Sequence, residues 1–115
     1  MSYDELTAVR VRQILAGRRD VAETKLMGGL CFMVAGNMAC SVSARGCILI
    51  RVGPDGIASA LKEPHASQMK MGSRAMTGFV RVDPEGYRTD ASLRKWVQRG
   101  VDFALTLPGK KVKKR

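Results

Sequence analysis

Hydrophobic residues recur along this chain with two different spacings, one typical of helices and the other of strands. Near the beginning, residues 4–17 place Ala8, Val11 and Leu15 on one side of a helix. Ser2 can cap that helix, since a serine side chain accepts a hydrogen bond from the first turn. We therefore predict an amphipathic helix that packs one side against the rest of the domain.

The clearest helical pattern lies near the other end of the chain. Thr89 or Asp90 can cap a helix there. Its apolar residues recur every three or four positions: Leu93, Trp96, Val97, Val101, Ala104 and Leu105. Gly100 lies inside this stripe, where glycine costs ~1 kcal/mol relative to alanine, so we expect another backbone to approach closely there. Trp96 should be buried against a sheet.

Short apolar runs between the two helices predict strands. Residues 30–34 and 38–43 flank Gly36-Asn37, and such an arrangement is typical of a β-hairpin with a two-residue turn. Two further runs, 47–52 and 78–82, predict a third and a fourth strand.

A short helix over residues 54–61 is expected after the third strand, because Pro54 suits a first helical turn. Residues 62–76 carry no clear period and are expected to be an irregular connection. The pattern predicts one α+β domain over residues 1–109, with an antiparallel sheet of about four to five strands, long helices at both ends and a short middle helix. A basic disordered tail, 110–115, would follow.

Alternation along the predicted hairpin and third strand divides the side chains into two faces of the sheet. The wholly apolar face, expected to meet the helices, would carry Cys31, Met33, Met38, Cys40, Val42, Ile48, Ile50 and Val52. The other face is mixed, and its candidate interface residues are Leu30, Phe32, Ser41, Leu49 and Arg51. A half-apolar sheet face is either an interface or the floor of a ligand site, although scattered surface hydrophobes are common.

Candidate catalytic and metal-binding residues are few. His65 is the single histidine, no phosphate-binding glycine motif occurs, and the acidic residues lie at helix starts, in turns or singly. Cys31, Cys40 and Cys47 are odd in number and lie in apolar stretches, so we interpret them as reduced, buried thiols rather than as zinc ligands with His65. We assign no catalytic residue, cofactor or metal site, and expect a protein that is not an enzyme.

The net charge is +10, and half of it comes from the last residues, Lys110, Lys111, Lys113, Lys114 and Arg115. This tail is either a solvated end or an electrostatic contact to a polyanion such as nucleic acid; it contains no aromatic residues for base stacking. The longest apolar run, Leu30–Ala35, is far shorter than the roughly 20 residues of a membrane span. We expect a cytoplasmic protein without membrane segments.

The segment from Met27 to Cys40, together with Leu49–Gly53 and Met76–Val82, resembles the N-terminal domain of the TfoX/Sxy family of bacterial competence regulators. The resemblance implies a secretion-chaperone-like fold of a kind that commonly forms homodimers. It also implies a role in transcription regulation, since full-length members regulate DNA-uptake genes together with a cyclic-AMP receptor-type activator. Those members carry a further C-terminal domain, whereas we expect this chain to act as a stand-alone domain.

Three hypotheses follow for function. The first is a homodimeric regulatory module that acts by protein–protein contact. The alternatives are a nucleic-acid-binding protein that uses its basic tail, and a small-molecule or enzymatic site on the mixed sheet face.

Overall fold

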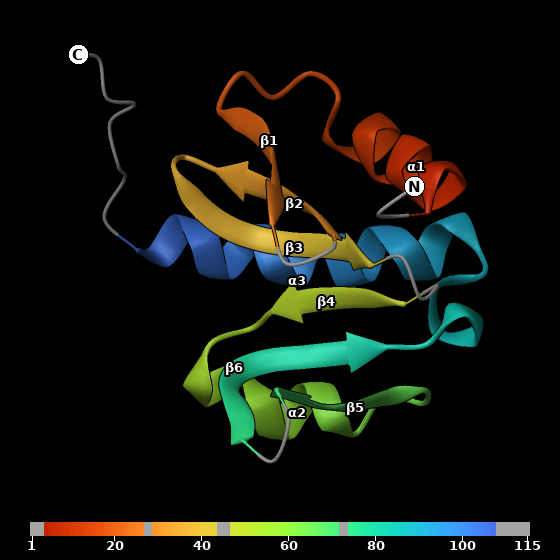
Figure 1. Ribbon diagram of the computed structural model, residues 1–115, viewed down its shortest axis with the longest axis vertical. Helices are drawn as coiled ribbons and strands as arrows, with labels where there is room; N and C mark the ends of the chain where they lie inside the picture. Colours follow the sequence, from red (N-terminus) through yellow and green to blue (C-terminus); the bar gives the residue numbers. More distant parts are fainter. Residues whose placement is uncertain (1–3, 27–28, 44–46, 72–73, 108–115) are drawn as a thin grey trace.

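An antiparallel sheet of six strands forms the centre of the computed structural model, which describes residues 4–26, 29–43, 47–71 and 74–107 (Figure 1). The strands lie in the order β1-β2-β3-β4-β6-β5. Their bounds are β1 Val21–Leu26, β2 Gly29–Val34, β3 Asn37–Ser43, β4 Ile48–Arg51, β5 Ala66–Met71 and β6 Arg74–Val82. The helices are α1 Glu5–Leu15, η1 Pro54–Gly56, α2 Ile57–Leu61, η2 Pro84–Tyr87 and α3 Asp90–Thr106. The predicted α+β class is confirmed, with slightly more strands than expected.

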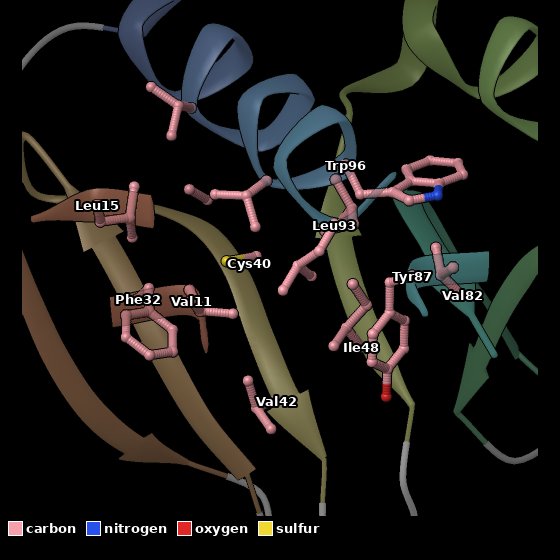
Figure 2. Close-up of a cluster of buried hydrophobic side chains, with 14 of the residues drawn as sticks. Val11, Leu15, Phe32, Cys40, Val42, Ile48, Val82, Tyr87, Leu93 and Trp96 are labelled. Carbon is pink, nitrogen blue, oxygen red and sulfur yellow. The ribbon is translucent and has the colours of Figure 1, made fainter. Parts of the chain in front are cut away.

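The helices bury their apolar sides against one face of the sheet. In Figure 1, α3 passes behind β3 and β4, and α2 lies behind β5 and β6. One hydrophobic core joins side chains of α1, α2 and α3 to the strands, and in Figure 2 Phe32 and Val42 lie on the same side of the sheet as Val11 and Leu93. Trp96 is buried in this core, as its place on the helical stripe predicts.

The turn of the β2–β3 hairpin differs from the prediction by one residue. Val34 pairs with Asn37, so the turn consists of Ala35 and Gly36, whose φ angles are 53° and 84°. Positive φ at both central residues is what a two-residue turn of type I′ requires, because its twist then matches that of the strands. Asn37, expected in the turn, instead begins β3.

A β-bulge beside this turn changes which side chains of β2 face the helices, because an extra residue on one strand reverses the facing of the residues paired beyond it. The candidate interface residues Leu30 and Phe32 are consequently in the hydrophobic core, at 3% and 0% exposure, and their predicted position on the outer face was wrong. The bulge is seen in the pairing, since Met33 pairs with Met38 but Phe32 pairs with Cys40. Ala39 is the extra residue, so Cys40 and Val42 still face the helices as predicted.

Two strands, β1 and β5, lie where the sequence pattern predicted none. Residues 62–76 were expected to be irregular, but β5 forms at Ala66–Met71 and β6 begins already at Arg74. The first strand, β1, was also missed. Both β1 and β5 are edge strands with exposed polar residues such as Thr24 and Gln68, so their apolar alternation is weak.

The sequence also predicts the caps of α1 and α3 and a close backbone contact at the glycine inside α3. Thr89 caps α3, and its Oγ1 accepts a hydrogen bond from Ser92 N at 3.1 Å, as predicted. The N-cap of α1 is Asp4 rather than Ser2, which lies outside the described residues. A Cβ on Gly100 would overlap the carbonyl oxygen of Ala39, which confirms the predicted close approach of a second backbone, here that of β3.

Candidate functional site

One face of the sheet carries no helix in the described part of the chain. All three α-helices contribute to the single core on the opposite face, and Figure 1 shows β4 and β6 with no helix in front of them. Leu49 and Arg51 of β4 pair with Arg81 and Phe79 of β6, respectively, and these four residues alternate with core residues. We call these four residues the open face.

The open face contains part of the interface that the sequence predicts. Leu49 and Arg51 are half-buried there, because their neighbours Ile48 and Ile50 point into the core. Ser41 pairs with Leu49 but is buried, so the accessible part of the sheet lies over β4 and β6. With Leu30 and Phe32 in the core, the predicted set does not form one surface patch.

The guanidinium group of Arg51 is the central feature of the open face. Its Cζ lies 5.9 Å from the ring centroid of Phe79 and 5.4 Å from that of Phe103 on α3. Gly53 makes room for this arrangement at the end of β4, since a Cβ there would overlap the Phe103 ring. Aromatic rings attract a cation through their negative faces and restrict its motion. Arg51 is therefore positioned by two rings that come from different elements.

The charges on the open face are unbalanced. Arg81 Nε lies 3.4 Å from Asp83 Oδ1, an exposed ion pair at the end of β6. For Arg51, the described residues provide ring contacts but no carboxylate within ion-pair distance. The planar guanidinium carries five N–H donors, and stacking on rings leaves those at its edge available. The open face thus presents an oriented positive charge beside apolar side chains.

Phe79, Arg81 and Phe103 were missed by the reasoning from sequence. Alternation along the predicted strand 78–82 does place Phe79 and Arg81 on one side of that strand. What the sequence lacked was the pairing partner of this strand, so neither residue could be joined to Arg51. Phe103 comes seven residues after Trp96, which puts it on a similar side of α3.

A second feature is an open hollow of about 410 Å³ between α1 and η2, lined by residues that include Leu6, Pro84 and Tyr87. Arg10 also lines it, and its Nη2 donates to the carbonyl oxygens of Tyr87 at 2.9 Å and Arg88 at 3.1 Å. These hydrogen bonds attach α1 to the segment before α3. Among the lining residues, the hydroxyl of the buried Thr7 donates a hydrogen bond to the carboxylate of Asp4, and neither a histidine nor a cysteine lines the hollow.

The cysteines and the histidine do not come together as a reactive site in the described residues. Cys31, Cys40 and Cys47 are free and buried, and burial raises the pKa of the Cys40 thiol to about 12. A thiol with so high a pKa is a poor nucleophile at neutral pH. His65 is exposed, directly before β5. Over the described ranges, no three His, Cys, Asp or Glu residues gather as metal ligands would.

The basic tail residues, Lys110, Lys111, Lys113, Lys114 and Arg115, lie outside the described residues. Among the helices of the described ranges, none is both long enough and apolar enough to span a membrane.

The fold and the open face together define a small α+β domain whose sheet is covered by helices on one side and accessible over β4 and β6 on the other. The sequence model of the TfoX N-terminal domain matches residues 13–104, and the chain belongs to this family. The family is one of regulatory domains and is associated with the regulation of competence. Searches among curated proteins and among solved structures each gave no match.

Proposed function

We propose that the chain is a non-enzymatic regulatory module that works by contact between its open face and another protein. The observation that carries this proposal is the composition of the open face: half-buried Leu49 and Phe79 surround an arginine that the fold holds in place. Arginine and aromatic residues are enriched at protein interfaces, where they supply most of the binding energy. Membership of a regulatory family supports the same function.

We further propose that the chain forms a homodimer, but through α1 rather than through the open face. Two copies joined by their open faces would bring Arg51 and Arg81 near the same residues of the partner, and like charges in contact are unfavourable. On α1, by contrast, Leu6 and Val9 are 77% and 43% exposed, three residues apart on one side of the helix. A symmetric pairing buries such a patch against itself.

The proposed regulatory contact is tested by affinity purification from the host cells with the wild-type chain and two variants. Leu49→Glu places a charge at the open face, while Arg94→Glu places one at an exposed position of α3. A partner protein should be recovered with wild type and with Arg94→Glu but lost with Leu49→Glu. It should then form a stoichiometric complex with the chain when both are purified. A partner retained by Leu49→Glu would place the contact elsewhere and refute the proposal.

Binding of nucleic acid through the tail is the alternative function, favoured by the five cationic residues within 110–115. Heparin chromatography of the full chain and of a chain ending at residue 109 separates the two functions. Strong retention that disappears with the tail favours this alternative, whereas absence of retention in both supports the protein contact. Retention that survives without the tail would point to a polyanion surface on the folded domain.

A further inference from the structure

We infer that the open face binds an acidic segment of its partner protein, with a carboxylate group seated on Arg51. This inference rests on the proposed function and specifies the chemistry of the partner. It follows from the position of the Arg51 guanidinium, from its neighbours and from the charge balance of the surrounding surface.

The guanidinium group of Arg51 is held in a defined position. Contacts at 5.9 Å and 5.4 Å to the rings of Phe79 and Phe103 fix the group from two elements, β6 and α3. An arginine loses side-chain entropy when it binds a ligand, and this loss is smaller when the side chain is already held. Arg51 can therefore receive a planar anion through two parallel N–H···O hydrogen bonds, the geometry that a carboxylate matches.

The surroundings of Arg51 are both apolar and positively charged. Leu49 and Phe79 are half-buried apolar residues on its two sides, and Arg81 adds a second positive charge across from Leu49. Of the described carboxylates, Asp83 is the one that forms an ion pair with a residue of the open face, namely Arg81. A partner segment that combines acidic and aliphatic residues would complement both the charge and the apolar character of this surface.

The aromatic residue of the open face favours an acidic protein segment over a nucleic acid. Single-stranded nucleic acids bind to sheets by stacking bases on exposed aromatic faces. On the open face, Phe79 is the aromatic residue of the described strands, and Arg51 already lies over its ring. The platform that base stacking needs is thus occupied, whereas the N–H donors of Arg51 remain available to a carboxylate.

The test measures fluorescence anisotropy with a labelled peptide rich in glutamate and interspersed with leucine. The wild-type chain should bind it, with an affinity that falls as the salt concentration rises. Arg51→Gln should weaken binding about tenfold, the loss of one charge-assisted pair. The matched control Arg94→Gln removes the same charge from an exposed position on α3 and should leave the affinity unchanged.

Several outcomes would overturn the inference. These are absence of binding by the glutamate peptide, equal binding of the same peptide with glutamine in place of glutamate, or equal effects of Arg51→Gln and Arg94→Gln. Arg51-dependent binding of oligothymidine that is tighter than binding of the peptide would assign the surface to nucleic acid instead.

A further variant keeps the test decisive if Arg51→Gln disturbs folding. Arg51→Lys preserves the charge but not the planar donors, so it should still bind more weakly than wild type. Affinity for the glutamate peptide that is unchanged in Arg51→Lys would contradict the carboxylate geometry.

The failure of this inference can be told apart from failure of the proposed function. If the purified partner depends on Leu49 but not on Arg51, the protein contact stands and the acidic segment is wrong. If no partner depends on Leu49, the proposed function itself fails.

Discussion

At the scale of single residues, Gly100 marks the place where α3 lies closest to the sheet. Its missing side chain leaves room for the carbonyl oxygen of Ala39, at the irregular position of β3. Gly100→Ala gains about 1 kcal/mol of helix propensity. The clash should cost about 1–3 kcal/mol, as overpacking of a core does. Because a backbone atom rather than a flexible side chain must move, we expect a net loss of stability.

Urea unfolding of Gly100→Ala measures this loss as a lower midpoint with an unchanged slope. Arg94→Ala, an exposed substitution on the same helix, is the control and should change stability by no more than about 0.5 kcal/mol. A Gly100→Ala protein more stable than wild type would contradict the close docking of α3 on β3.

Cys40 predicts a decline of stability in alkaline solution. Burial raises the pKa of its thiol from 9.0 to about 12, so the folded protein keeps the proton at a pH where the unfolded chain has lost it. The stabilising contribution is complete below pH 9 and disappears as the pH rises toward 12.

Denaturant unfolding of wild type and Cys40→Ala across this pH range provides the measurement. The variant should lose less stability between pH 9 and pH 12, although truncation of a buried side chain lowers its stability at neutral pH. If the free energy of unfolding falls equally with pH in the two proteins, Cys40 does not contribute to the alkaline loss of stability. Burial also raises the pKa of Tyr87, but this residue is present in both proteins and its effect cancels in the comparison.

At the scale of elements, the spacing of apolar residues predicted the helices and the central strands but not the strands at the edges of the sheet. The helical stripe through Leu93, Trp96 and Val97 predicted α3, its Thr89 cap and the burial of Trp96. The edge strands β1 and β5 contact a neighbour on one side only, so their sequences need fewer apolar residues. Length and apolar pattern therefore predicted the central strands but not these two.

The candidate site shows a second limit of the sequence. Leu49 and Arg51 lie on the outer face, as the alternation predicts, because β4 is regular and Ile48 and Ile50 point into the core. Leu30 and Phe32 were placed wrongly because the extra residue Ala39 in β3, a bulge that the apolar pattern does not indicate, reverses the facing of β2. The ring contacts of Arg51 join β4, β6 and α3, a combination that depends on strand order and was not predictable from local pattern.

At the scale of the whole molecule, the proposed homodimer gives a prediction about mass. Sedimentation equilibrium at micromolar concentration should report twice the 12.5 kDa of one chain. Leu6→Glu should give a folded monomer, because a charge in the centre of an apolar interface is costly. Leu105→Glu is the matched control, since Leu105 is an exposed leucine on α3, and it should remain dimeric.

A mass of 12.5 kDa for wild type at every concentration tested would end the dimer proposal. A dimer that persists in Leu6→Glu would move the interface away from α1. Phe32→Asp, in contrast, is no test of an interface, because Phe32 is a core residue and its replacement should unfold the domain.

The ion pair between Arg12 of α1 and Glu23 of β1 helps to protect the domain against aggregation at high concentration. β1 is the edge of the sheet, and a bare edge can template the stacking of one molecule on another. Glu23 is paired in register with the core residue Phe32, so it directs a charge toward the covered side of this edge. Such an inward charge would have to be desolvated if a foreign strand docked there. The hydrogen bonds from Arg12, at 2.7 and 2.9 Å, lower the pKa of Glu23, so this protection against aggregation extends to more acidic solutions than an unpaired glutamate would allow.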